Sequence, residues 1–357
     1  MRWFVLLLAI GCQRGASKPA DPVAPQRRDV TALVGKAARA AIGDVGGHPA
    51  LVLVDADAMR VIDRSGKEVA REPVPAGIEQ LSIAGGAILA GWGESREHRG
   101  VQPSVTRTRL DKGQLLDEIV VAPTSARADV VGVIPEGADL IVAYFDSKYG
   151  VTEATASRTG DAWTTSAPIS IRMATSWARG DLDGSGTRAT VVGRLYGDDK
   201  GVDGDAFILG ADGTRTVLPT TRGVQSLALA DTDGDGRAEI FVGDGWHQSY
   251  LQHAQGLLTW IRKVDGAWHA ELIENTPGQY AILQIVAADL DGDGKPELVT
   301  RGNKYVRAYK RSGDTWKGLT IGGEARDIAV GDIDGKGVAV LIVGDKSELV
   351  DLHGSWR

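Results

Sequence analysis

The stretch Asp231-Thr-Asp-Gly-Asp-Gly-Arg-Ala-Glu239 recurs almost unchanged as Asp289-Leu-Asp-Gly-Asp-Gly-Lys-Pro-Glu297. Each copy lies between two short apolar runs and places acidic residues at loop positions 1, 3, 5 and 9. Carboxylates at this density repel one another unless a cation lies among them, and hard oxygen ligands suit Ca²⁺. Glycines at positions 4 and 6 let the backbone wrap closely around a small ion. The sequence therefore predicts two Ca²⁺ sites, whose residues are Asp231, Asp233, Asp235, Arg237, Glu239, Asp289, Asp291, Asp293, Lys295 and Glu297.

Two other interpretations of these loops are less favoured. An EF-hand loop opens with a similar pattern, but it needs a bidentate glutamate at position 12 and flanking helices. Position 12 is Val242 in one copy and Thr300 in the other, and the flanks are short β-rich runs. The second alternative is an acidic turn without metal, because Asp and Gly are common turn residues. Four acids at fixed offsets, present twice, favour the calcium loop over both.

Three further stretches resemble the loop in degenerate form. The first, Asp181-Leu-Asp-Gly-Ser-Gly, has Ala189 at position 9, and we expect it to hold a third Ca²⁺ weakly. The second, Asp332-Ile-Asp-Gly-Lys-Gly, carries Lys336, whose ammonium group is expected to neutralise the aspartates itself. The third keeps only Asp44 and is predicted to be a simple turn. The residues expected at the weak third site are Asp181, Asp183 and Ser185.

Self-similarity along the chain predicts the architecture. The loops and their equivalents lie about 40 to 60 residues apart, a spacing typical of β-propeller blades. They open at Asp44, Gly85, Pro135, Asp181, Asp231, Asp289 and Asp332. Each unit also carries a second glycine turn, and short β-rich runs separated by such turns are typical of hairpins. We predict an all-β protein, a seven-bladed β-propeller of four-stranded antiparallel blades over residues 29–357.

The two ends of this region predict how the ring closes. After the last glycine turn, at Gly354, too few residues remain for a strand. The segment Asp29-Val-Thr-Ala-Leu-Val34 is a surplus run before the first unit. We therefore expect this N-terminal segment to supply the outer strand of the seventh blade.

The sequence at this point resembles the FG-GAP/VCBS repeat family, the seven-bladed propellers known from integrin α-subunit heads. The resemblance rests on residues 231–242 and 289–300 and extends to the degenerate stretches 181–193 and 332–344. It implies the propeller fold, calcium in the loops and ligands on the face opposite them. It says little about which ligand is bound, because propellers host many functions.

The first residues predict export and lipidation. Residues 1–12 combine one basic residue with a short apolar run and form a predicted signal peptide. Its end, Ala9-Ile-Gly-Cys12, resembles a bacterial lipobox, although Ala9 stands where leucine is usual, and Cys12 is the only cysteine of the chain. Acyl chains on Cys12 would anchor the protein to a membrane; an ordinary secreted protein with a chance cysteine is the alternative. Residues 13–28 are rich in Pro and Ala and predict an extended tether, and Gln13 after the cysteine favours the outer membrane of the bacterial envelope.

Blade geometry predicts where ligands bind. Successive turns of an up-and-down blade alternate between two faces, so the calcium loops lie opposite the loops that join strands two and three. Those loops are long in the second to fifth units, over residues 92–102, 144–151, 194–205 and 244–256. Aromatic residues mixed with charges suit a carbohydrate or protein ligand, although ordinary solvated loops are the alternative. The predicted ligand residues are Trp92, Tyr144, Tyr149, Tyr196, Trp246, His247 and Tyr250.

These observations favour a binding or scaffold module of the cell envelope. The formal net charge of −7 argues against a nucleic-acid partner, and a monomer is expected. No nucleophile elbow, zinc signature or phosphate loop is present, so no catalytic residue is predicted. A calcium-dependent enzyme acting on polysaccharide, such as a lyase, and an envelope assembly factor remain the alternatives.

Overall fold

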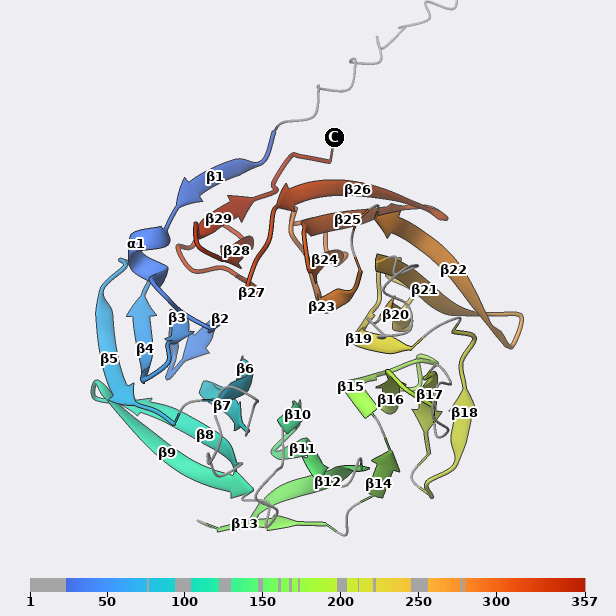
Figure 1. The fold of residues 1–357 in the computed structure, drawn as a ribbon, viewed down its shortest axis with the longest axis horizontal. Helices are drawn as coiled ribbons and strands as arrows, with labels where there is room; N and C mark the ends of the chain where they lie inside the picture. Colours follow the sequence, from blue (N-terminus) through green and yellow to red (C-terminus); the bar gives the residue numbers. More distant parts are fainter. Residues whose placement is uncertain are drawn as a thin grey trace, which may run out of the picture.

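Seven four-stranded blades surround a central axis, as predicted (Figure 1). The structure is a computed structural model that describes residues 24–75, 77–93, 104–121, 130–146, 150–159, 162–166, 169–172, 174–197, 204–210, 212–220, 223–244, 256–276, 278 and 280–356. Within each blade, consecutive strands pair in antiparallel fashion from the axis outward. The seventh blade differs, because its outermost strand comes from the N-terminal end.

The strands of the first four blades follow one another along the chain. Blade one comprises β2 (Arg39–Val45), β3 (His48–Val54), β4 (Ala58–Asp63) and β5 (Glu68–Pro73). Blade two comprises β6 (Ile78–Ala84), β7 (Ala87–Trp92), β8 (Ser104–Asp111) and β9 (Gln114–Val121). Blade three comprises β10 (Val130–Glu136), β11 (Asp139–Asp146), β12 (Gly150–Thr159) and β13 (Ala162–Thr165), with the extra strand β14 (Ile169–Arg172) paired to β12. Blade four comprises β15 (Ala174–Gly180), β16 (Ala189–Arg194), β17 (Ala206–Leu209) and β18 (Arg215–Val217).

The last three blades contain both intact acidic loops. Blade five comprises β19 (Val224–Ala230), β20 (Glu239–Asp244), β21 (Gly256–Val264) and β22 (Ala267–Thr276). Blade six comprises β23 (Ile282–Ala288), β24 (Glu297–Gly302), β25 (Val306–Ser312) and β26 (Thr315–Gly322). Blade seven comprises β27 (Asp327–Gly331), β28 (Ala339–Val343), β29 (Glu348–Asp351) and β1 (Gln26–Asp29).

The hydrophobic core lies between neighbouring blades. The second strand of a blade is covered on both faces, so β7, β20 and β28 are buried along their whole length. One core cluster joins Phe241 and Trp260 of blade five to Ile282, Leu298 and Tyr309 of blade six. Each blade therefore buries its apolar faces only against its neighbours, which is why a closed ring is needed.

The N-terminal strand closes the ring, three residues earlier than the sequence predicts. β1 pairs antiparallel with β29, from Gln26 opposite Asp351 to Asp29 opposite Glu348. The predicted closing segment was 29–34, but Thr31–Val34 forms the short helix α1. Oδ1 of Asp29 accepts a hydrogen bond of 2.9 Å from the Thr31 amide, which turns the chain away from the sheet.

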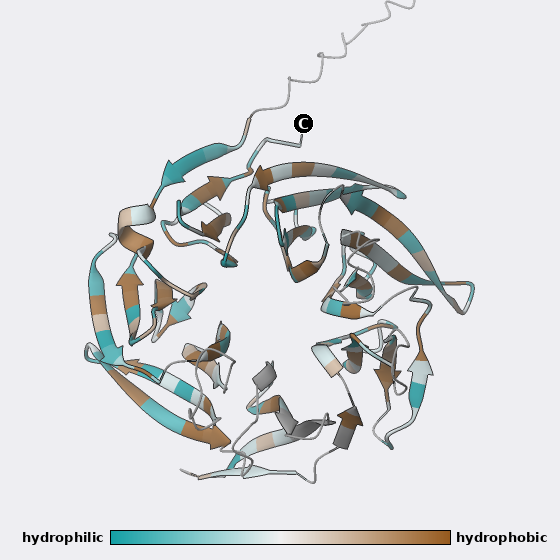
Figure 2. Cartoon of the chain, viewed as in Figure 1, coloured by the Kyte–Doolittle hydropathy of each residue, from teal (hydrophilic) through white to brown (hydrophobic). Residues whose placement is uncertain are grey.

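The composition of β1 explains the error. Its four residues are all polar and exposed, and Figure 2 shows this strand as hydrophilic along its length. Such a strand has the composition of a linker, so the sequence predicts Gln26–Arg28 as part of the tether. The ion pair between Arg27 and Glu348, at 2.7 Å, supports the pairing. The propeller therefore begins at Gln26 rather than at residue 29, and the predicted signal peptide and Cys12 lie outside the described residues. Among the residues the structure describes, no helix has the length and apolar character required to cross a membrane.

Candidate metal centres and ligand face

The first aspartate of each acidic loop organises the backbone. In blade five, Asp231 accepts hydrogen bonds from the amides of Gly234 at 2.7 Å, Asp235 at 3.1 Å and Gly236 at 2.8 Å. Asp289 binds the equivalent amides of the blade-six loop. Gly234 and Gly236 have φ values of 78° and 86°, a region that side-chain-bearing residues rarely adopt. Both glycine positions of the motif are therefore required by the loop conformation.

The degenerate loops keep this geometry. Asp181 of blade four also accepts from the amides of Gly184 at 2.8 Å and Gly186 at 2.7 Å. In blade seven, Asp332 accepts from the Gly335 amide at 2.6 Å. The loop conformation therefore does not depend on a complete set of acids.

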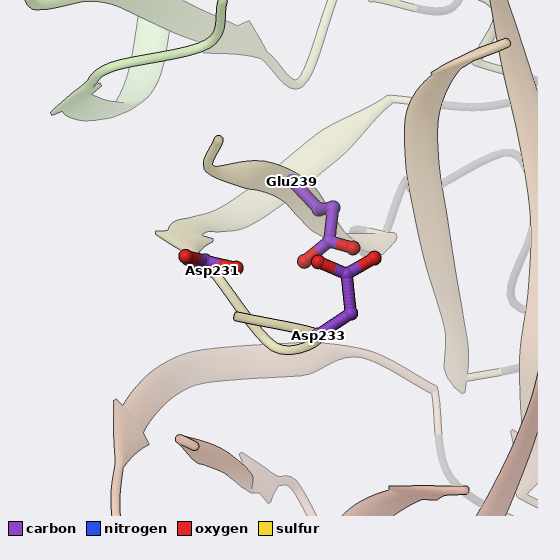
Figure 3. Close-up of side chains that lie close together, drawn as sticks. All are labelled: Asp231, Asp233 and Glu239. Carbon is purple, nitrogen blue, oxygen red and sulfur yellow. The ribbon is translucent and has the colours of Figure 1, made fainter. Parts of the chain in front are cut away.

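Three carboxylates gather in each intact loop. In blade five, Asp231, Asp233 and Glu239 each place an oxygen within 4.8 Å of the others (Figure 3). Asp289, Asp291 and Glu297 do the same in blade six, and these are the two such groups among the described residues. The structure thus brings together positions 1, 3 and 9 of the predicted site.

Loop positions 5 and 7 are arranged differently from this triad. Oδ1 of Asp235 accepts from the Arg237 amide at 2.8 Å, and Oδ1 of Asp293 accepts from the Lys295 amide at 2.9 Å. The Lys295 side chain reaches back to the preceding blade and donates to the carbonyl of Asp233 at 2.7 Å. The side chain at position 7 therefore connects neighbouring loops.

The position-9 glutamates lie deepest. Side-chain exposure is 9% for Glu239 and 2% for Glu297. Burial raises the pKa of Glu239, with hydrogen bonds from Thr232 opposing the rise. Burial likewise raises the pKa of Glu297, opposed by the hydrogen bond from Lys310. A nearby cation therefore favours the ionised form of both carboxylates.

Lys310 of β25 provides such a cation in blade six. Its Nζ lies 2.5 Å from Asp291, 2.6 Å from Asp293 and 2.9 Å from Glu297. Although burial disfavours the charged form, these three hydrogen bonds raise the pKa of Lys310 above its ordinary value. Oδ1 of Asp291 is nevertheless buried without a hydrogen-bond partner. The site thus offers four carboxylate oxygens, one of which has no hydrogen-bond partner. Ca²⁺ is bound by oxygen ligands, so the blade-six residues fit this ion.

Arg311, the next residue, provides the cation in blade five. Its Nη1 lies 3.0 Å from Asp233 and also contacts Oε1 of Glu239. Neither cation belongs to the acidic motif, so the motif does not predict them. A detectable signal was the basic pair directly before the glycine turn, which recurs as Arg262-Lys263 in blade five.

Among the described residues, the blade-seven loop has two cations, the expected Lys336 and also Arg28, which the sequence did not predict. Nζ of Lys336 lies 3.6 Å from Asp334, and Arg28 of β1 lies 3.3 Å from the same carboxylate. Lys336 therefore does pair with an aspartate of its loop.

The predicted ligand residues are only partly described. Tyr149, Trp246, His247 and Tyr250 lie outside the described residues. Tyr144 and Tyr196 are half-buried, and Tyr144 packs against the core between blades two and three. Trp92 requires a correction, because it is 2% exposed and its Nε1 donates to Thr106 at 3.0 Å. The strand β7 runs through Trp92, so this ring belongs to the core and not to the loop.

Two exposed tyrosines lie on the predicted ligand face of blade six. Tyr280, which precedes β23, is 40% exposed, and Tyr305, between β24 and β25, is 36% exposed. Oδ1 of Asn303 accepts from the Tyr280 amide at 2.7 Å and so ties the two segments together. Nζ of Lys304 lies 5.4 Å from the Tyr280 ring. The loop that carries Tyr305 is short, so loop length does not predict these two tyrosines as ligand residues.

A polar cavity of about 510 Å³ runs along the axis, lined by the first strands of six blades, β2, β6, β15, β19, β23 and β27. Asp327, 4% exposed, lies at the mouth on the ligand face, where it accepts from the Ala40 amide at 2.8 Å. Burial raises the pKa of Asp327, opposed by the charge of Arg39. Arg301 lies on the same mouth and donates to Gln284 at 3.1 Å. Charge and hydrogen-bonding groups thus converge on the same face as the tyrosines.

Comparisons with known proteins support the fold. No protein-family model matches the sequence, and no curated protein matches it. The extracellular domain of BT4673 from B. thetaiotaomicron is similar with a TM-score of 0.59 and 11% identity, over 92% of this chain and 40% of that chain. A second structure of that domain gives 0.56 and 11%, over 92% and 39%. A structure described as the Dos1 propeller gives 0.51 and 12%, over 86% and 76%. The chain thus spans about 40% of the BT4673 chain, and at these identities the likeness concerns the fold alone.

Proposed function

We propose that this protein is an extracytoplasmic binding or scaffold module of the FG-GAP/VCBS type, in which Ca²⁺ stabilises one face and the opposite face binds a carbohydrate or protein ligand. The observation that carries the proposal is the division of the two faces. Acidic loops with ordered backbones lie on one, and exposed tyrosines with a polar channel mouth lie on the other. The likeness of the fold to extracellular domains is consistent with this role.

Ca²⁺ acts structurally in this proposal. Asp289, Asp291, Asp293 and Glu297 would hold the ion in blade six, where it would take the place of the Lys310 ammonium group beside these carboxylates. An ion that binds the folded loop and not the unfolded chain stabilises the fold by linkage. EDTA should then lower the melting temperature of the protein, and Ca²⁺ should restore it. An unchanged melting curve, with no calcium in the purified protein, would contradict the metal part of the proposal.

The ligand face is tested by binding to a glycan array and to envelope proteins. Tyrosine rings favour stacking against sugar rings or apolar side chains. We expect Tyr280→Ala together with Tyr305→Ala to weaken binding at least tenfold. Ile119→Ala is the matched control, because Ile119 is 66% exposed on the outer strand β9 of blade two. Equal binding by both variants would remove the tyrosines from the site, and release of unsaturated sugars would favour the lyase alternative.

The cellular location follows from the N-terminal motif. Acyl groups on Cys12 would hold the protein at the membrane, with residues 13–25 as the tether. Metabolic labelling with palmitate should therefore mark the native protein and not Cys12→Ser. Equal recovery of both proteins in the soluble envelope fraction, with no label, would contradict the lipid anchor.

A further inference from the structure

We propose that the two intact acidic loops have different cations: Arg311 permanently fills the blade-five loop, and only the blade-six loop takes up Ca²⁺. This inference deepens the calcium part of the proposed function and rests on it for blade six. The two loops share the same acids at positions 1, 3, 5 and 9. The difference therefore comes from residues outside the motif.

Arg311 is held in place from several directions. Its Nη1 contacts Asp233 at 3.0 Å, Thr232 Oγ1 at 3.3 Å and Oε1 of Glu239. Its Nε donates to the carbonyl of Gly313 at 2.8 Å. The guanidinium carbon lies 4.3 Å from the ring centre of Trp260, which is fully buried. With only 8% of its side chain exposed, Arg311 cannot leave without breaking all these contacts.

Asp231, Asp233 and Glu239 of blade five already have hydrogen-bond partners. Oε2 of Glu239 accepts from the amide and the hydroxyl of Thr232, both at 2.8 Å, while Oε1 contacts Arg311. Both oxygens of Asp231 bind loop amides. A Ca²⁺ ion would have to displace a buried guanidinium from its carboxylates, so this loop does not fit the metal.

Lys310 is held less firmly in blade six. Its side chain is 22% exposed, and the contacts described for its Nζ are the three carboxylates themselves. A flexible lysine at the edge of the site can turn into solvent when Ca²⁺ arrives. The buried, unpartnered Oδ1 of Asp291 marks the ligand position that Lys310 does not satisfy. Lys310 is thus a replaceable cation where Arg311 is a fixed one.

The strand β25 explains how two adjacent residues serve two loops. Neighbouring residues of a strand point to opposite faces of the sheet. Lys310 therefore reaches the loop of its own blade, and Arg311 reaches that of the preceding blade. In blade five, Arg262 occupies the position that Lys310 occupies in blade six. Arg262 pairs with Glu271 at 2.9 Å and with Asp314 at 3.0 Å, and not with the acids of its own loop. The blade-five loop consequently depends on Arg311 for its cation.

Calcium titration of the metal-free full-length protein, by calorimetry and by Tb³⁺ luminescence, tests the inference. We expect one site in the native protein, none in Asp291→Asn and two in Arg311→Met. The second site of Arg311→Met should disappear again in Arg311→Met with Asp233→Asn. Lys317→Met is the matched control, because Lys317 is exposed on the adjacent strand β26, and it should keep one site.

The outcomes separate the inference from the calcium proposal. Two sites in the native protein, lost one at a time by Asp233→Asn and Asp291→Asn, would overturn the role of Arg311. If the native protein has no site and Arg311→Met has one, the result would support the claim that Arg311 fills the blade-five loop. The same result would contradict the claim that the blade-six loop binds Ca²⁺. If Arg311→Met does not fold, Arg311→Lys replaces it, and an unchanged stoichiometry and melting temperature there would count against the inference.

Discussion

Nζ of Lys310 on β25 lies 2.9 Å from Oε1 of Glu297 on β24, and this carboxylate is 2% exposed. The pair joins the second and third strands of blade six beneath the acidic loop. Removing one member of a buried ion pair leaves the other charge without compensation. The stability of blade six therefore depends on the cation beside Glu297, which is either the Lys310 ammonium group or a bound Ca²⁺.

Lys310→Met should show this link directly. In EDTA we expect the variant to lose about 2 kcal/mol of unfolding free energy in urea, because Glu297 and Asp291 lose their cation. In saturating Ca²⁺ the loss should shrink, and the calcium affinity should rise, because the competing ammonium group is gone. Lys317→Met, exposed on the neighbouring strand β26, is the control. An equal loss with and without Ca²⁺ would show that Lys310 and the ion do not share a site.

Because β1 closes the ring, we predict that the melting temperature depends sharply on the N-terminal end of the propeller. A chain that starts at residue 24 keeps β1 and its pairing with β29, whereas a chain that starts at residue 31 exposes the edge of blade seven. We expect the shorter chain to melt at least 5 °C lower, since the pairing, the Arg27–Glu348 ion pair and the closed ring are lost together. The chain starting at residue 24 is the matched control. Equal melting temperatures in a thermal scan would show that β1 contributes nothing to closure.

The sequence predicted the ring, its four-stranded blades and the loop backbone because these follow from local repeats of aspartate and glycine. It did not predict Lys310 and Arg311, because their contacts with the acids join positions 13 to 78 residues apart. It placed Trp92 in a loop because nothing in the local pattern marks where β7 ends. It shifted the closing strand because a polar outer strand such as β1 has the composition of a linker. Errors thus arose where tertiary contact, rather than the repeat, decides the structure.

Blades five and six pack closely at Gly243 on β20, where there is no room for a side chain. A Cβ atom added there would lie 2.4 Å from Oγ of Ser226 and 2.5 Å from Cβ of Ile282 on β23 of the next blade. Gly243→Ala should therefore cost about 1–3 kcal/mol of unfolding free energy, because the well-packed interface must open. Gly323→Ala is the control, since its added methyl would meet no atom within 4 Å. Equal urea midpoints for the two variants would mean that the interface accommodates the added methyl group without loss of stability.

Glu72 on β5 predicts a pH dependence of stability near neutrality. Burial raises the pKa of Glu72 to about 7, reinforced by the neighbouring charge of Asp117 on β9. Thr108 donates a hydrogen bond to Asp117, which keeps that side chain in place, and Oε1 of Glu72 is buried without a hydrogen-bond partner. The folded protein thus keeps Glu72 protonated at pH values where the unfolded chain, with an ordinary value of 4.5, has released the proton.

The sign of the effect follows by linkage. A pKa raised in the folded state gives stability that is fully present below pH 4.5 and is lost as the pH rises through about 7. Glu72→Gln should remove this loss, so at pH 8 it should be more stable than the native protein by about 1 kcal/mol, after allowance for its partial exposure. Urea unfolding between pH 4 and 9 measures the difference, and Glu324→Gln at an exposed position is the control. A constant difference across this range would mean that the pKa of Glu72 is not raised in the folded protein.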